Sequence, residues 1–182
     1  RPTVRHGGPR GRVRSRFHTP RRVETIERLR EEDLLPTIYF IFSRNGCHEA
    51  ANRYLDGGAR LTGADERRRI REIAAERTRA LTDAELDVLG HDRWLATLEH
   101  GVAAHHAGMI PAFRETVEQC FVEGLLKGVF ATETLALGIN MPARSVVIER
   151  LSKFNGETHE MLNAGQFTQL TGRAGRRGID EE

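Results

Sequence analysis

The chain has 182 residues, of which 38% are hydrophobic, and this suits one compact domain with a buried core rather than a disordered chain. Its 28 basic and 26 acidic residues give a formal net charge of only +2, so the chain as a whole lacks the strong positive charge of many nucleic-acid binders. It has no apolar run of roughly 18 residues, no signal-peptide core and only two well-separated cysteines, so we expect a cytoplasmic protein with free thiols and no membrane partner.

Residues 1–35 are expected to form a basic lead-in. Residues 1–22 hold eight arginines and no acidic residue, and several glycines and prolines interrupt any regular element. This composition suits an inter-domain linker and also a contact to phosphates, and the residues leave both interpretations open. A short charged helix from Arg22 to Leu34 follows, and Pro36 ends it because the residue before a proline avoids helical backbone. We therefore expect the packed domain at residues 36–182.

The first element of that domain is an apolar run at residues 37–42, rich in β-branched and aromatic side chains, which predicts a strand buried on both faces. Ser43 is then suited to cap the N-terminus of a following helix. Residues 57–99 are charged and helical, and Thr82 with Glu85 form a capping box. We expect this part to be a charged helical insertion or a peripheral helical layer.

From residue 101 onward, strand and helix patterns alternate, which predicts an α/β fold with a parallel, doubly wound sheet. The helix after the first of these strands is amphipathic, and we expect Glu115, Glu118 and Glu123 to point outward from it. The expected strands lie at residues 101–106, 128–132 and 145–148, and the expected helices at 110–124 and 164–173.

The most specific chemical pattern is near the C-terminus. On a helix, Gln169, Arg173 and Arg176 are spaced i, i+4, i+7, so they would share one face. Two guanidinium groups and an amide on one face suit the binding of phosphate oxygens. Gly172 and Gly175 leave that face uncrowded, so that a phosphate can come close. A merely solvated basic tail would not need these glycines, which are poor helix formers.

Polar residues also follow the expected strands, at the edge where ligands of open α/β sheets bind. Thr132, Glu133 and Thr134 follow one strand, and Gly138 with Asn140 would form a tight turn. An ordinary strand-to-helix loop is an equally good interpretation of this segment alone.

A second candidate at the same edge is the segment of Ser43 and Arg44, which suits either a phosphate at a helix N-terminus or a simple helix cap. Adjacent residues of a strand point to opposite faces, so His105 and His106 are not expected to grip one metal ion together. The sequence has no CxxC or HxxxH spacing, and we predict no metal site in this chain.

Together these segments resemble a known set of motifs. Residues 130–143 are similar to helicase motif V, and residues 169–178 to motif VI, whose form is QxxGRxGR. Residues 38–44 resemble motif IV, and residues 105–111 resemble the motif IVa region. The chain is thereby identified as similar to the second RecA-like (helicase C-terminal) domain of a superfamily 2 DExH helicase. The residues of motifs V and VI are similar to those of the superkiller or exosome-associated branch, which includes bacterial HelY-like members.

The resemblance implies roles in an ATP cleft. Arg173 and Arg176 match arginine fingers that reach the γ-phosphate, and Gln169 matches a polar residue that organises the same cleft. Gly138 and Asn140 match positions near the ATP ribose, although the DEAD-box branch has Asp where Asn140 stands. The further cofactor-binding residues expected are Glu133, which ties the cleft to the nucleic-acid side, and Gly172.

The resemblance also implies contacts to a single strand of nucleic acid, mainly through its backbone phosphates. Such contacts carry no base information, so RNA is favoured over DNA only through the exosome-type likeness. The residues expected on the strand are Thr132, Ser43, Arg44, Arg114 and His106.

The sequence has no GxxxxGK[ST] phosphate loop and no strand-borne DExH box. In the family these belong to the first RecA-like domain, which is the expected partner and would hold most of the ATP and Mg²⁺. We therefore expect a fragment that supplies half of an ATP-dependent helicase motor and is inactive alone. A non-catalytic nucleic-acid-binding module, based on the arginine-rich lead-in, and a double-stranded DNA translocase are the alternatives. The sequence leaves the polarity of movement, the protein partners and the oligomeric state open.

Overall fold

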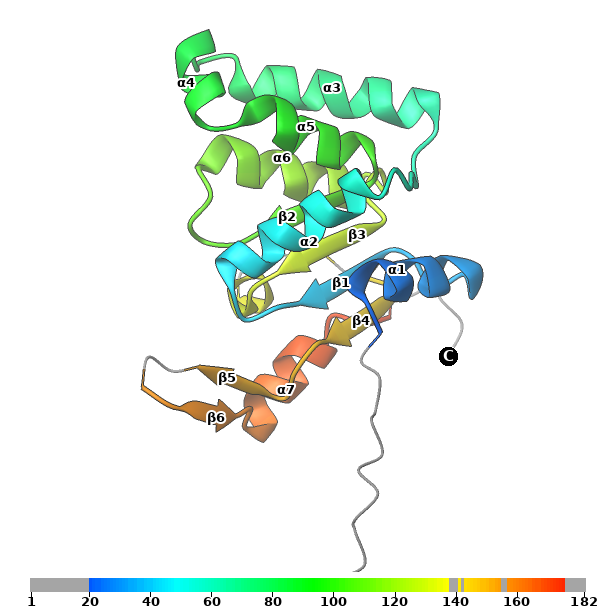
Figure 1. Cartoon of the computed structure of the whole chain (residues 1–182), viewed down its shortest axis with the longest axis vertical. Coiled ribbons are helices and arrows are strands. Elements are labelled where there is room, and N and C mark those ends of the chain that lie inside the picture. The colour runs from blue at the N-terminus through cyan, green and yellow to red at the C-terminus, as the bar shows by residue number, and fades with distance from the viewer. Residues whose placement is uncertain (1–19, 138–140, 142, 155–156, 176–182) are drawn as a thin grey trace, which may run out of the picture.

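The structure is a computed structural model that describes residues 20–137, 141, 143–154 and 157–175 (Figure 1). Its centre is a four-stranded parallel sheet in the order β2-β3-β1-β4. This confirms the expected α/β fold with a RecA-like parallel sheet flanked by helices. The strands are β1 Thr37–Phe40, β2 Val102–His105, β3 Gly128–Ala131 and β4 Ser145–Ile148.

Helices cover both faces of the sheet, because each central strand has apolar side chains on both sides. On one face, Tyr39 and Ile41 pack with Ile26 and Ala50, which come from the helices α1 and α2. On the other face, Ile38 and Phe40 belong to a larger core formed with the remaining helices. The helices are α1 Arg22–Glu31, α2 Arg44–Asp56, α3 Ala64–Thr78, α4 Asp83–Val88, α5 His91–Glu99, α6 Pro111–Val122 and α7 Ala164–Thr171.

The charged segment 57–99 forms the helices α3, α4 and α5, and Figure 1 shows them stacked with α6 at one end of the molecule. The capping box of Thr82 and Glu85 is present at the start of α4. Trp94 of α5 stacks on Phe113 of α6, with their ring centroids 3.9 Å apart and their planes inclined by 6°. The segment is therefore a packed helical layer with a charged outer surface. Its treatment as an insertion into the domain stays a prediction.

Helix α1 belongs to the packed structure, since Ile26 is fully buried against the sheet. The helix ends at Glu31, slightly before the predicted end at Leu34. The division of the chain at residue 36 stays a prediction. The arginines of residues 1–19 lie outside the described residues.

The last helix is shorter than predicted. It ends at Thr171, with Gly172 as its C-cap, whereas the sequence predicted helix to about Arg173. The carbonyl of Arg173 accepts a hydrogen bond from the amide of Ala143 at 2.9 Å, and Ala174 pairs with Ala143 in a short parallel bridge. This tertiary bond replaces helical bonding at a site where glycine already weakens the helix. The prediction that Arg173 shares a continuous helical face with Gln169 is therefore wrong.

A small antiparallel hairpin between β4 and α7 was not predicted. Its strands are β5 Ser152–Phe154 and β6 His159–Met161, and Figure 1 shows it projecting beside α7. The residues of β6 are exposed, so the hairpin lacks the apolar alternation by which a strand is found in a sequence.

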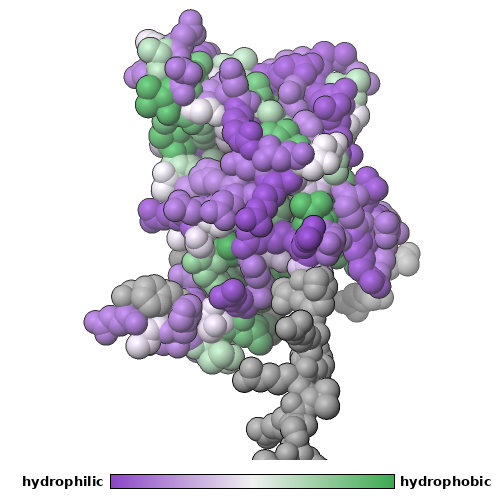
Figure 2. All heavy atoms as spheres, viewed as in Figure 1, coloured by the Kyte–Doolittle hydropathy of each residue, from purple (hydrophilic) through white to green (hydrophobic). Residues whose placement is uncertain are grey.

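The surface is mainly hydrophilic in the view of Figure 2, with a hydrophobic area beside α4. Val88 and Leu89 at this end are 87% and 38% exposed. Both cysteines are free and buried as predicted, and burial raises the pKa of each thiol to about 12. None of the described helices is long and apolar enough to cross a membrane.

Candidate nucleic-acid and nucleotide interface

Residues that follow the four parallel strands meet at the carboxyl edge of the sheet. His106 follows β2, Thr132 follows β3, Ser43 lies just beyond β1, and Glu149 follows β4. Backbone hydrogen bonds connect the strand ends, from the Thr132 amide to the His105 carbonyl at 3.2 Å and from the Glu149 amide to the Phe40 carbonyl at 3.2 Å. The structure thus brings together segments that are distant in the sequence.

The motif IV segment forms the N-terminus of α2. Ser43 is the N-cap as predicted, and its hydroxyl accepts a hydrogen bond from the Gly46 amide at 3.1 Å. Ser43 and Arg44 are exposed. A Cβ at Gly108 would lie 3.1 Å from Nη1 of Arg44, so the Arg44 guanidinium lies directly over the loop after β2. Motifs IV and IVa therefore form one continuous surface.

The two adjacent histidines point to opposite sides, as predicted. Nε2 of His106 lies 2.7 Å from Nε2 of His48, and its Nδ1 accepts a hydrogen bond from the Gly108 amide at 3.2 Å. Burial lowers the pKa of His106 to about 4, and the neighbouring His48 and Arg44 add to the shift. The neutral His106 ring therefore donates from Nε2 to His48. His106 is 5% exposed, so it reaches the surface only through His48, which is exposed.

On the other side, His105 supports Arg114 through a carboxylate. Nε2 of His105 lies 2.9 Å from Oε1 of Glu118, and Nε of Arg114 lies 3.6 Å from the same oxygen. The prediction that Glu118 points outward is wrong, because its carboxylate turns back to this buried histidine. Burial lowers the pKa of His105, although Glu118 opposes the shift. Arg114 is thereby held at the sheet edge with its side chain one-third exposed, at 34%.

The motif V segment begins at this edge and continues toward α7. The hydroxyls of Thr132 and Thr134 are 2.9 Å apart, and a 3-10 helix, η1, covers Glu133–Leu137. Both carboxylate oxygens of Glu133 lie 3.3 Å from Nζ of Lys153 in the hairpin. Gly138 and Asn140, expected near a ribose, lie outside the described residues.

The motif VI segment packs against motif V. Leu170 of α7 shares the buried core with Leu135, Met141 and Ala143. Gln169 and Gly172 are exposed, and Arg173 is partly exposed. Arg176 lies outside the described residues.

These groups fit one side of a nucleotide site. Gln169 offers an exposed amide, and the Arg173 guanidinium can bind a phosphate. Within the described ranges, no cluster of His, Cys, Asp or Glu side chains suits a metal ion. The residues therefore fit a contact to ATP better than they fit the binding of Mg²⁺.

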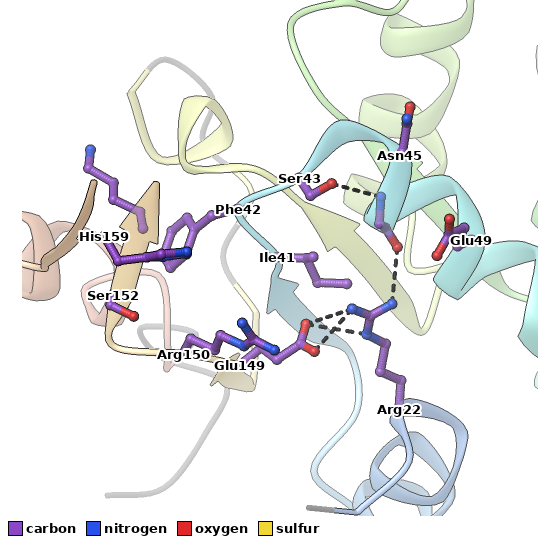
Figure 3. A pocket seen from close by; sticks show the side chains of 12 residues that line it. Arg22, Ile41, Phe42, Ser43, Asn45, Glu49, Glu149, Arg150, Ser152 and His159 are labelled. Atoms are coloured by element: carbon purple, nitrogen blue, oxygen red, sulfur yellow. Dashed lines mark hydrogen bonds and ion pairs between the residues drawn. The ribbon is translucent and has the colours of Figure 1, made fainter. Parts of the chain in front are cut away.

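A hollow of about 360 Å³ lies at the same edge, and sequence reasoning missed it (Figure 3). Arg22 of α1 makes a two-point ion pair with Glu149, through Nε at 3.2 Å and Nη2 at 3.0 Å. Nη1 of Arg22 also donates to the Gly46 carbonyl at 3.3 Å. Arg22 and Glu149 are 127 positions apart, so no local pattern could have paired them. The residues around the hollow are Arg22, Ile41, Phe42, Ser43, Asn45, Gly46, Glu49, Glu149, Arg150, Ser152, Lys153 and His159.

Comparison with known proteins gives concordant matches. The helicase conserved C-terminal domain matches residues 61–178. The probable helicase HelY of Mycobacterium tuberculosis is 58% identical over 166 residues, which make up 91% of this chain and 18% of that protein. The exosome RNA helicase MTR4 of Homo sapiens is 35% identical over 158 residues, 86% of this chain and 15% of that protein. The antiviral helicase SKI2 of Saccharomyces cerevisiae is 36% identical over 157 residues, 86% of this chain and 12% of that protein.

The parallel sheet, with its motif-bearing carboxyl edge, has the features of a RecA-like motor domain. With the match over residues 61–178, the chain belongs to the helicase conserved C-terminal domain family. Its relatives include HelY and DExH-box RNA helicases, which confirms the resemblance to a HelY-like superfamily 2 DExH helicase. The chain spans less than a fifth of the length of HelY, MTR4 and SKI2.

Proposed function

We propose that this domain is the C-terminal half of an ATP-driven nucleic-acid helicase motor. It contacts one strand along the carboxyl edge of its sheet and supplies arginines to an ATP cleft. The first RecA-like domain of the same polypeptide forms the other wall of that cleft. The relatives support this assignment, because they include a probable helicase and an exosome RNA helicase.

The observation that best supports this proposed function is the path of the motif V segment, which runs from the carboxyl edge of the sheet to motif VI. Thr132, at one end, lies at the carboxyl edge of the sheet beside the loop after β2. Ala143, at the other end, bonds to Arg173 of motif VI, and Leu135 packs with Leu170 between them. One segment thus links the proposed strand-binding edge to the proposed ATP-binding residues. Movement at either surface would be transmitted to the other through this packed connection.

On the strand side, the exposed groups suit phosphates. Ser43 and Arg44 lie at the positive end of α2, where backbone amides and the helix dipole favour an anion. Arg114 and Thr132 extend the same edge, and His106 supports it from beneath through His48. These contacts position a strand without reading its bases.

On the nucleotide side, Arg173 and Arg176 stabilise the negative charge that develops on the γ-phosphate during transfer. Fingers of this kind accelerate nucleotide hydrolysis by about 10³–10⁵. Gln169 orients the phosphates, Gly172 leaves room for them, and Gly138 with Asn140 meets the ribose. Glu133 connects the nucleotide side of the domain to the nucleic-acid side, and its carboxylate accepts a hydrogen bond from Lys153 in the β5–β6 hairpin. Bound ATP supplies the phosphoanhydride bond, and Mg²⁺ is held mainly by the first domain.

The domain alone does not hydrolyse ATP, because the phosphate loop and the DExH carboxylates belong to the first domain. RNA is the favoured strand, because several relatives are named RNA helicases.

The test is ATP hydrolysis by the intact protein, with and without single-stranded RNA, single-stranded DNA or duplex DNA. Stimulation by single-stranded RNA, together with strand separation, is the expected result. Stimulation by duplex DNA without strand separation would instead identify a double-stranded DNA translocase. Binding without any hydrolysis would identify a non-catalytic nucleic-acid-binding module and overturn the proposal.

A further inference from the structure

Of the residues proposed above to contact the strand backbone, Ser43 lines the hollow in Figure 3, and its aromatic lining residue, Phe42, has no role in that proposal. It lies between the ends of β1 and β4, the first turn of α2 and the β5–β6 hairpin. Its volume of about 360 Å³ lies within the range of roughly 300–1,000 Å³ of small-molecule sites. It directly adjoins Ser43, where the backbone of a bound strand is expected to pass.

An aromatic ring takes part in the lining of this hollow. Phe42 packs partly against the buried core, and the rest of its side chain contributes to the wall of the hollow. Figure 3 shows the ring directed away from Ile41, toward the side of the hairpin where His159 lies. A ring that is supported from the core and open toward a cavity is suited to stack on a planar group.

Four polar side chains around the hollow have no side-chain hydrogen bond or ion pair within the described part of the chain. Asn45 offers both a donor and an acceptor, Ser152 offers a hydroxyl, Arg150 is a donor and Glu49 is an acceptor. The edges of nucleobases also present donors and acceptors side by side. Sequence-specific proteins commonly recognise unpaired bases by stacking them on an aromatic ring and hydrogen bonding to their edges.

The charges around the hollow suit a whole nucleotide, that is, a base together with its backbone phosphate. Glu149 is neutralised by its two-point pair with Arg22, so this wall does not repel a nearby phosphate. Glu49 has no such partner among the described residues, and its negative charge disfavours an isolated polyphosphate. Arg150, at the end of β4, remains available for a backbone phosphate of the same nucleotide.

We propose that this hollow takes up one unstacked nucleobase of the bound single strand, with Phe42 as the stacking platform. This inference rests on the proposed function, because the strand must first lie along the carboxyl edge of the sheet. It adds a contact to a base at one fixed position, whereas Ser43, Arg44 and Thr132 contact only the backbone. Ser152, which lies on the hairpin side of the hollow together with Phe42, is the residue that contacts the edge of the base (Figure 3).

The test uses the intact protein and single-stranded RNA and DNA oligonucleotides in which one abasic position is moved along the strand. For the wild type, one position is expected to weaken binding on the order of tenfold, in line with the energy of base–aromatic stacking. Phe42→Leu keeps an apolar contact to the core but removes the ring, so it loses this position-specific penalty. Phe42→Tyr keeps the ring and keeps the penalty.

Phe167→Leu is the matched control, because Phe167 is an exposed aromatic residue that does not line the hollow, and this variant keeps the penalty. A 2-aminopurine placed at the sensitive position gives a second readout that needs no variant. Its stacking on Phe42 is expected to change its fluorescence emission when the wild-type protein binds. Tight binding without any sensitive position, an unchanged emission, or a penalty that persists in Phe42→Leu would overturn the base site and leave the proposed function standing. Absence of binding to every strand would overturn both.

Discussion

At the scale of single residues, Arg22 connects three elements at the carboxyl edge of the sheet. Its guanidinium joins α1 to Glu149 at the end of β4 and to the Gly46 carbonyl in the first turn of α2. The Arg22 and Glu149 side chains are only 24% and 22% exposed, so their pairing is less screened by solvent than a surface pair. An arginine of the lead-in is therefore part of the packed domain.

Replacement of Arg22 by alanine is expected to lower the free energy of unfolding by about 1–2 kcal/mol, because it leaves the Glu149 carboxylate partly buried and unpaired. Arg28→Ala is the matched control on the same helix. Arg28 pairs with Glu32 on the exposed surface, with 78% of its side chain accessible, and its loss is expected to cost about 0.5 kcal/mol or less. Urea unfolding of both variants measures the difference. Equal losses would contradict the structural role of Arg22.

The pair of His106 and His48 predicts a dependence of stability on pH. The pKa of His106 is about 4 in the folded domain and about 6.5 when unfolded, so protonation favours the unfolded state. Its contribution is complete above about pH 6.5 and is lost as the pH falls toward 4. His106→Asn retains an acceptor for the Gly108 amide but cannot be protonated.

This variant is expected to be less stable than the wild type at pH 7.5 but to lose less stability between pH 7 and pH 5. Urea unfolding at a series of pH values measures both effects. A pH dependence as steep as that of the wild type would show that the titrating group lies elsewhere.

At the scale of elements, β3 carries the motif V segment and lies between β2 and β1. Val129 is fully buried at its centre. Val129→Asp places an unpaired charge in the core and is expected to cost more than about 4 kcal/mol, enough to unfold many domains. Val88→Asp is the control, because Val88 on α4 is 87% exposed and the same change should be tolerated.

Circular dichroism and thermal unfolding compare the two variants. An unchanged melting curve for Val129→Asp would contradict the central position of β3.

The elements show what can be predicted from the sequence and why. Apolar runs and caps predicted β1, β3, β4 and the start of α2, because their signals lie within a few residues. The predicted end of α7 was two residues too late, although Gly172 is a local signal for a helix end. The bond between Arg173 and Ala143 could not be predicted, because these residues are far apart in the chain. The β5–β6 hairpin was missed, because its exposed residues give no hydrophobic alternation.

Some features of the candidate site could likewise be predicted from the sequence, and others could not. Motif spacing placed Ser43, Arg44 and Thr132 at one edge, because parallel strands align their carboxyl ends. The inward turn of Glu118 was hidden, because a glutamate on an amphipathic helix normally faces solvent and its partner His105 lies on another element. The lining of the hollow was also hidden, because Phe42 has the pattern of one more apolar residue of a strand.

At the scale of the whole molecule, motif V joins the carboxyl edge of the sheet, where we propose that the strand binds, to the motif VI segment, which we propose faces the nucleotide. Leu135, Met141 and Leu170 pack together in the buried core along this connection. In the proposed mechanism, closure of the first domain on ATP moves this body as a unit, and the strand follows.

The most direct measurement is ATP hydrolysis and strand binding by the intact protein carrying Arg173→Ala and Arg176→Ala together, beside the wild type and Arg79→Ala. Arg79 is exposed and has no ion pair among the described residues, so it controls for the loss of an arginine. The double variant is expected to lose hydrolysis by about 10³ or more while it still binds the strand, and Arg79→Ala is expected to resemble the wild type. Normal hydrolysis in the double variant, or loss of strand binding with hydrolysis retained, would contradict the assignment of Arg173 and Arg176 to the ATP cleft.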